Sequence, residues 1–329
     1  MTHPFRSFAR LATLGTALVL AGGAQADDVT LRFSTAGPGA DFLAKAMDSF
    51  AAEVASAEVG VTVETYPGSS LIRQGAEVPA LQRGNLEMST MSTFEIAAQV
   101  PAMGFLNRAF LFKDYDQMME VMQGPFGETL HDAVAKDMDI EILATAYLGS
   151  RELNLRDVHA VTGPEDLAGV RMRMPASPEW LLLGESLGVS PTPLPMSETY
   201  VALQTGSVDG QENPLSILKA AKFDEVTKQV IMTNHLVQPV FFAMAKPVWD
   251  GMSEDQQKVV KAAALTAAAQ NNDARSADEA KVVDALRAEG IQVDTPDLTP
   301  FFQKADAVYA ASDLAQQWDQ DLMHQVMGD

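Results

Sequence analysis

Apolar and polar positions along the first part of the chain alternate between the spacing of strands and the spacing of helices. Residues 29–33 alternate apolar and polar side chains, and the breaker run of 36–39 follows them. Apolar residues then recur at helical intervals before a second alternating run begins. The predicted elements are strands over 29–33 and 61–66 and helices over 43–54 and 72–83, the last interrupted by Gly75 and Pro79. This order is typical of a parallel sheet with crossover helices.

The same alternation returns in the second half of the chain. Strands are predicted over 140–147, 170–174 and 237–244, and a helix over 178–187. The sequence therefore favours a large α/β protein over an all-helical or all-β one.

The residues from 253 to about 288 differ from the rest because they lack proline and glycine and are rich in alanine. Ser253 and Gln256 form a capping box at the start, and Gly290 supplies a stop. One helix of this length would extend roughly 55 Å at 1.5 Å per residue, which is more than the width of one small domain. We expect it to run along two lobes, and a break near 271–273 is the competing interpretation.

The N-terminus has the three parts of a secretory signal in the right order. Arg6 and Arg10 precede the uncharged apolar run of 11–22, and the small residues of 24–26 form a cleavage site. The run is shorter than the roughly 20 apolar residues that span a bilayer. We expect residues 1–26 to be a signal peptide and the mature protein to begin at Asp27. A buried amphipathic helix is the alternative.

Composition narrows the compartment and the partners. Loss of two arginines with the signal would take the formal charge from −21 to about −23, so no nucleic-acid partner is expected. The chain has no cysteine, which excludes disulfides, thiolate metal sites and a lipid anchored on cysteine. A secreted protein without such an anchor is retained by an outer membrane, so we expect the periplasm of a Gram-negative bacterium.

Motifs for catalysis are missing from the sequence. The histidines after the signal are isolated, without the spacing of a metal site, and neither a nucleophile elbow nor a P-loop is present. We therefore predict no catalytic residues, no metal, no cofactor and no enzyme activity. A pair of carboxylates that converge only in three dimensions would escape this reasoning.

Two arginines lie within the predicted strand of 170–174. Alternation places Arg171 and Arg173 on one face, and Pro175 ends the strand just after Arg173. Ligands of open α/β sheets bind outside the carboxyl ends of strands, and a guanidinium matches a carboxylate in a bidentate pair. The alternative is that both arginines are solvated or paired with nearby acids. A second polar cluster, 202–214, is explained mostly by turn chemistry.

Three motifs together resemble a known family. Residues 166–175, 191–200 and 202–214 are similar, in this order, to the substrate-binding subunit of tripartite ATP-independent periplasmic (TRAP) transporters of the dicarboxylate and sialic acid type. The similarity extends over the whole mature chain. It implies an α/β clamshell of two lobes, each a mixed sheet flanked by helices, with the long helix spanning both lobes.

The resemblance also implies residue roles. It makes Arg173 the arginine that clamps the ligand carboxylate, Arg151 a second pocket arginine and Asn213 a hydrogen-bond donor to the carboxylate or an adjacent hydroxyl. Residues 34–41 and 89–93 match the wall on the other lobe. Met196 stands where similar proteins usually carry phenylalanine, which favours a modest organic acid over a nine-carbon sugar. The candidate ligand-binding residues are Arg173, Arg151, Asn213, Met196, Trp180 and Ser92.

The resemblance implies a monomeric solute-binding protein that closes on a small organic acid and delivers it to the small and large integral membrane subunits of a TRAP permease. We expect one lobe to comprise 27–149 and 237–272, and the other 150–236 and 273–329. The alternative function is a ligand-sensing partner of a membrane receptor, which needs the same clamshell.

Overall fold

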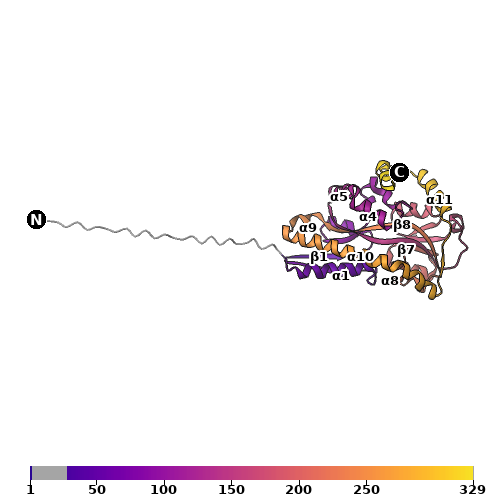
Figure 1. Cartoon of the computed structure of the whole chain (residues 1–329), viewed down its shortest axis with the longest axis horizontal. Helices are drawn as coiled ribbons and strands as arrows, with labels where there is room; N and C mark the ends of the chain where they lie inside the picture. Colours follow the sequence, from indigo (N-terminus) through magenta and orange to yellow (C-terminus); the bar gives the residue numbers. More distant parts are fainter. Residues whose placement is uncertain (2–27, 329) are drawn as a thin grey trace.

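The computed structural model describes residue 1 and residues 28–328 of the chain. Apart from Met1, the predicted signal peptide and its cleavage site lie outside the described residues. Between residues 28 and 328, nine strands form one sheet, and helices cover its faces (Figure 1). No helix in this part of the chain combines the length and the hydropathy that crossing a membrane requires.

The sheet runs in the order β2-β1-β3-β8-β4-β7-β5-β6, and β9 pairs with β8 outside this path. Its strands are β1 (Val29–Ser34), β2 (Val61–Tyr66), β3 (Met88–Ser92), β4 (Ile140–Leu155), β5 (Arg171–Met174), β6 (Ser190–Pro193), β7 (Gly210–Pro214), β8 (Gln229–Ala245) and β9 (Gln292–Asp294). The strands β2, β1 and β3 are parallel at one end, and β7, β5 and β6 are parallel at the other. Antiparallel pairs formed by β4 and β8 join the two ends.

Ten helices lie between these strands in the described part of the chain, and α11 and α12 follow β9. They are α1 (Phe42–Ser56), α2 (Glu77–Gln82), α3 (Thr93–Ala97), α4 (Tyr115–Gln123), α5 (Pro125–Met138), α6 (Pro178–Ser186), α7 (Thr199–Thr205), α8 (Leu215–Ala220), α9 (Lys246–Gly251), α10 (Glu254–Ala288), α11 (Thr299–Ala310) and α12 (Gln320–Met327). Short 3-10 turns cover Pro101–Asn107, Pro164–Leu167, Met196–Glu198, Phe223–Glu225 and Ala315–Gln317.

The two central strands are longer than the sequence pattern predicts. Only the first half of β4 and the second half of β8 were expected, whereas the strands have 16 and 17 residues. Gly149, with a φ of 124°, and shifts in the pairing of β4 with β8 interrupt the alternation on which that expectation depended. Each strand therefore continues past its irregularity and runs from one end of the sheet to the other.

The predicted helix over 72–83 is confirmed only in its second half. Only α2 forms there, because Gly75 takes a left-handed φ of 85°, and a helix cannot pass through that conformation. The preceding residues form turns, which leaves Gln74 in a loop rather than on a helix.

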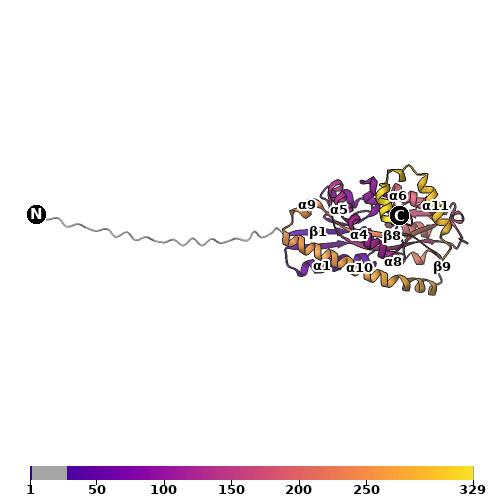
Figure 2. The ribbon, with the colours of Figure 1, turned by 45° about the horizontal axis from the view of Figure 1, so that its top comes forward.

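The long helix is confirmed as one unbroken element, α10, which extends along the molecule from the end near α9 to the end near β9 (Figures 1 and 2). Its capping box at Ser253 and Gln256 is present. Asn271 and Asn272, which suggested a break in this helix, instead attach it to the sheet by hydrogen bonds to β4. Asn272 accepts from the backbone N–H of Tyr147 at 2.7 Å, and Asn271 donates to its carbonyl at 2.8 Å.

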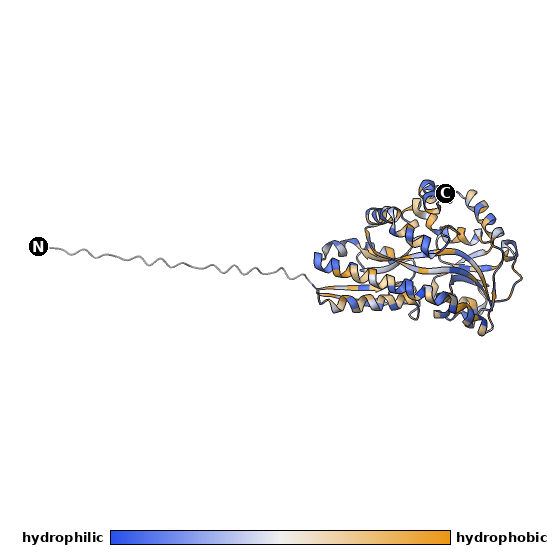
Figure 3. Cartoon of the chain, viewed as in Figure 1, coloured by the Kyte–Doolittle hydropathy of each residue, from blue (hydrophilic) through white to orange (hydrophobic). Residues whose placement is uncertain are grey.

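Separate apolar clusters lie under the two ends of α10. Its first half packs with β1 and α1 around Phe33, Phe50 and Phe242, whose rings meet edge to face. Its last turns pack Val282 and Leu286 into another cluster with α7 and α8. Hydrophilic and hydrophobic residues alternate along α1 and α10, as expected of helices with one buried face (Figure 3).

Candidate ligand-binding site

A cavity of about 60 Å³ lies where both ends of the sheet contribute side chains. The loop after β1, the end of β3 and α3 form one part of its wall, and residues of β4, β5 and β7 form the other. All six candidate residues lie on this wall: Ser92, Arg151, Arg173, Trp180, Met196 and Asn213. The structure thus brings together residues that are up to 121 positions apart in the sequence.

Arg173 contributes a buried cation to the cavity wall. Its side chain is 1% exposed, Nε donates to the carbonyl of Leu194 at 2.9 Å, and Nη2 donates to Oε1 of Gln74 at 2.9 Å. Both partners are neutral, and no carboxylate among residues 28–328 forms an ion pair with it. Burial lowers the pKa of Arg173 to about 10, so the group stays charged at neutral pH. A buried cation of this kind is costly until an anion binds.

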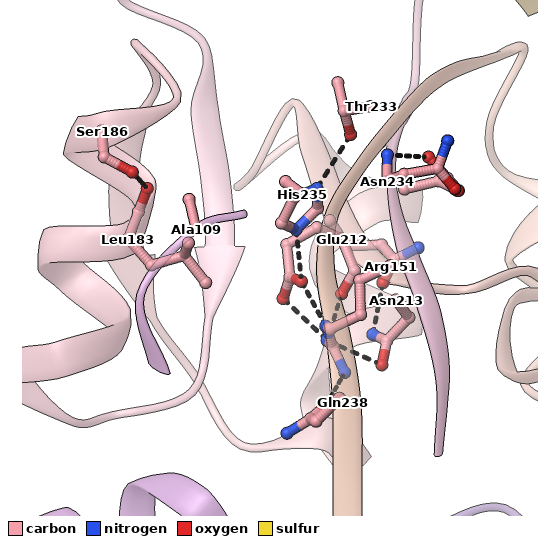
Figure 4. A network of polar contacts seen from close by, with 12 residues as sticks. Ala109, Arg151, Leu183, Ser186, Glu212, Asn213, Thr233, Asn234, His235 and Gln238 are labelled. Atoms are coloured by element: carbon pink, nitrogen blue, oxygen red, sulfur yellow. Dashed lines mark hydrogen bonds and ion pairs between the residues drawn. The ribbon is translucent and has the colours of Figure 1, made fainter. Parts of the chain in front are cut away.

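Arg151, in contrast, is already neutralised by the protein (Figure 4). Its Nε donates to Oε2 of Glu212 at 2.5 Å, and Nη2 donates to Oε1 of Glu212 at 2.8 Å. Nη2 also donates to Oδ1 of Asn213 at 2.9 Å, and Nη1 donates to Oε1 of Gln238 at 2.8 Å. The ring of Trp180 lies 4.6 Å from the guanidinium carbon. Most of the donors of Arg151 are therefore engaged before any ligand arrives.

Glu212 and His235 extend this network to residues that do not line the cavity. Burial alone would raise the pKa of Glu212, but Arg151 and His235 outweigh it and hold that pKa below the usual range. Burial lowers the pKa of His235, so its ring is neutral. Nε2 of His235 lies 3.2 Å from Glu212, and Nδ1 lies 2.8 Å from the hydroxyl of Thr233. This arrangement fixes the carboxylate that in turn holds Arg151 (Figure 4).

The other candidates shape the wall. Trp180 is buried and meets Phe94 edge to face, with ring centroids 6.3 Å apart. Met196 donates its backbone N–H to Gln74 at 2.7 Å. Asn213 donates from Nδ2 to Gln211 at 2.6 Å, which leaves one Nδ2 hydrogen for another acceptor. Ser92 is the N-cap of α3.

Arg171 matches the alternative interpretation, in which the arginine is paired with a nearby acid at the surface. It is exposed and forms an ion pair with Asp209 at 2.6 Å on the outside of the sheet. Alternation along β5 places Arg171 and Arg173 on one face, as predicted, but only Arg173 reaches the cavity.

Five residues of the wall or its support were not singled out from the sequence: Gln74, Glu77, Glu95, Glu212 and Gln238. Glu212 lies within the polar run of 211–213, but a run does not reveal which side chain faces an arginine. Gln74 lies in a loop, Glu77 and Glu95 lie in the short helices α2 and α3, and Gln238 lies on β8. Among residues 28–328, no group of three or more His, Cys, Asp and Glu side chains is arranged to hold a metal ion.

Comparison with known proteins decides the family. Residues 33–315 match the model of the bacterial extracellular solute-binding proteins, family 7. The chain belongs to this family. The family 7 protein is 37% identical to a TRAP periplasmic solute-binding protein from Roseobacter denitrificans, whose crystal structure contains 3-deoxy-D-manno-oct-2-ulosonic acid. The match covers 92% of this chain and 99% of that chain, with a TM-score of 0.88.

Further relatives of the family 7 protein bind other acids. A sialic acid-binding periplasmic protein of Vibrio cholerae is 28% identical over 92% of this chain and 90% of its own. A second TRAP periplasmic solute-binding protein from Roseobacter denitrificans, solved with β-D-glucuronate, is 26% identical, covers 91% of this chain and 99% of its own, and has a TM-score of 0.85. The resemblance to TRAP solute-binding proteins and the two-lobe α/β fold are thereby confirmed.

Proposed function

We propose that this solute-binding protein captures a small organic acid through its carboxylate and presents it to a TRAP-type permease. The observation that carries the proposal is Arg173, a buried cation on the cavity wall that has only neutral partners among the described residues. A carboxylate that pairs with it bidentately would gain roughly 1.5 to 3 kcal/mol for each charge-assisted hydrogen bond.

The roles of the remaining wall residues follow from the hydrogen bonds they already make. Glu212 neutralises the charge of Arg151. Arg151 therefore forms a rigid, hydrogen-bonding part of the cavity wall and does not bind a second ligand carboxylate. Asn213 offers its remaining amide hydrogen to the carboxylate or an adjacent hydroxyl. Trp180 and Met196 supply apolar wall, and Ser92 a hydroxyl.

The proposal includes opening and closing. One lobe would comprise 27–149 and 237–272 and the other 150–236 and 273–329, so the cavity would lie between lobes. Without ligand, water must solvate Arg173, which favours open lobes, and a bound acid shifts the population towards closure. We expect a monomer, secreted to the periplasm by residues 1–26, that binds the acid without chemical turnover.

The test is a binding screen of the protein from Asp27 onward, refolded to remove any carried ligand. C4-dicarboxylates, sugar acids, 2-keto acids, aromatic acids and neutral sugars are compared by thermal shift, and hits are titrated by calorimetry. A ligand at about a hundred times its Kd stabilises by about 2.7 kcal/mol, which raises Tm by a few degrees.

Arg173→Ala is expected to weaken carboxylate binding by at least about 3 kcal/mol, more than a hundredfold, because the ligand anion loses its cation. Arg171→Ala is the matched control, since that arginine lies outside the cavity and should leave Kd unchanged. Hits confined to neutral solutes, or a loss below about tenfold in Arg173→Ala, would contradict the proposal.

A further inference from the structure

Two carboxyl groups line the same cavity and take no part in the arginine network. Glu77 is the first residue of α2, and Glu95 lies in α3. Their side chains belong to residues only 3% and 8% exposed. Neither forms an ion pair with a described lysine, arginine or histidine, although the cavity contains two arginines. The wall therefore has a cationic part at Arg173 and a separate part made of carboxyls.

Each of these carboxyls keeps one oxygen without a hydrogen-bond partner among the described residues. Oε2 of Glu95 accepts from the backbone N–H of Ser92 at 2.9 Å, while its Oε1 has no partner. Oε2 of Glu77 has none either. Buried polar atoms are nearly always satisfied in native proteins, so two such atoms on residues that line one cavity indicate hydrogen-bond donors supplied from within it.

The electrostatic setting restricts what those donors can be. Burial raises the pKa of both carboxyls well above the usual range, and the charge of Glu77 raises that of Glu95 further. Above these raised pKa values both carboxyls are charged, and a second ligand carboxylate placed here would then meet two like charges without a cation that pairs with them, which is unfavourable. A hydroxyl group would instead donate to the free oxygens, and it would accept from whichever carboxyl holds a proton.

We propose that Glu77 and Glu95 form a subsite that recognises ligand hydroxyl groups. The preferred ligand is then a polyhydroxylated monocarboxylate, and dicarboxylates bind more weakly. This inference rests on the proposed function, since it assumes that Arg173 holds the single carboxylate. Selectivity arises from repulsion as much as from attraction, because the acidic pair admits a hydroxylated chain end and rejects an anionic one.

The experiment compares ligands that differ only at the chain end. Gluconate and galactonate are titrated beside glucarate and galactarate, which carry a second carboxylate in place of the terminal hydroxymethyl group. Succinate and 6-aminohexanoate complete the panel. The titrations are run at a pH above both raised pKa values, and there we expect the better monoacid to bind at least about tenfold more tightly than its matched diacid. Glu95→Gln and Glu77→Gln should narrow that ratio to below about threefold, mainly by improving diacid binding, because the amide removes the repulsion.

Glu152→Gln is the matched control, since Glu152 is equally buried but does not line the cavity. It should leave the ratio unchanged. The comparison of monoacids with diacids is made in the unmodified protein. It therefore tests the proposed subsite even if a substitution impairs folding. Diacids that bind as tightly as monoacids, a ratio unaffected by both substitutions, or preferential binding of 6-aminohexanoate would overturn the subsite and leave the proposed function standing. Absence of binding by every acid would overturn the proposed function itself.

Discussion

The difference between Arg151 and Arg173 lies in which acceptors surround each guanidinium. Both are buried on one wall, and both come from strands of the same part of the sheet. Glu212 matches the charge of Arg151, whereas Arg173 contacts only a carbonyl and an amide. Arg151 is therefore part of the structural support of the cavity, whereas Arg173 is the arginine whose charge is not matched by an anion among the described residues.

Buried carboxyls predict an unusual dependence of stability on pH. Burial raises the pKa of Glu152 to about 8, against an ordinary value near 4.5. The folded state therefore binds more protons than the unfolded state between these values, and stability falls as pH rises through this window. Glu77 and Glu95 act in the same direction. The buried histidines have lowered pKa values and act in the opposite direction only below about pH 6.5.

We expect the free energy of unfolding, measured with urea, to fall between pH 7 and pH 8 by up to about 1.4 kcal/mol per raised carboxyl. In Glu152→Gln this slope should be shallower, because the amide cannot titrate. Asp28→Asn, at an exposed position, serves as the control. A slope that is flat in the unmodified protein, or that is unchanged in Glu152→Gln, would contradict the assignment.

At the scale of elements, β4 depends on one glycine. Gly149 has a φ of 124°, and a Cβ added there would lie 2.5 Å from Cβ of Pro214 on β7. The pairing of β4 with β8 shifts between Tyr147 and Gly149. This position is where the proposed lobes meet, so the glycine lets one strand serve both lobes while keeping β7 close.

Gly149→Ala is expected to destabilise the protein by at least about 2 kcal/mol, because alanine is strained at this φ and collides with Pro214. Urea unfolding measures the loss. Gly251→Ala is the control, since a Cβ there meets nothing within 4 Å and its φ is not positive. Equal stability of the two variants would show that β4 can rearrange around the added methyl group.

At the scale of the whole molecule, the loop before α2 connects the two walls of the cavity. Oε1 of Gln74 accepts from both Arg173 and the backbone N–H of Met196. Its neighbour Arg73 forms an ion pair with Glu198 at 2.8 Å, but both of these side chains are more than half exposed. If the lobes open without ligand, contacts of this kind form only on closure and so contribute to affinity.

Gln74→Ala should therefore weaken binding of the best acid about tenfold or more, because two partly buried hydrogen bonds of the closed state are lost. Arg73→Ala should change Kd by less than about threefold, since exposed ion pairs contribute little. Calorimetry measures both, and small-angle scattering should show a smaller radius of gyration on adding ligand. Equal losses in the two variants, or no change in radius, would contradict closure through this loop.

Much of the architecture was predictable because it depends on local pattern. The period of apolar residues predicted β1, α1, β2, β5 and α6, and the absence of proline and glycine from 253 to 288 predicted α10. The motifs at 166–175, 191–200 and 202–214 indicated the family, and the six candidate residues do lie on one cavity wall. The helix over 72–83 was predicted too long because Gly75, which the sequence marked as an interruption, takes a left-handed conformation through which a helix cannot continue.

The sequence by itself determined the family and the α/β architecture, and through the family resemblance it made Arg173 the leading candidate for the ligand carboxylate, since each depends on the order of residues along the chain. Only the tertiary structure decided that Glu212 neutralises Arg151, that Gln74 contacts Arg173, and that Glu77 and Glu95 share a cavity. Side chains 61 and 99 positions apart interact only after folding has brought them together and removed water from between them. The order of side chains along the sequence does not show which groups surround a charged residue after folding. These surroundings determine its pKa and its partners.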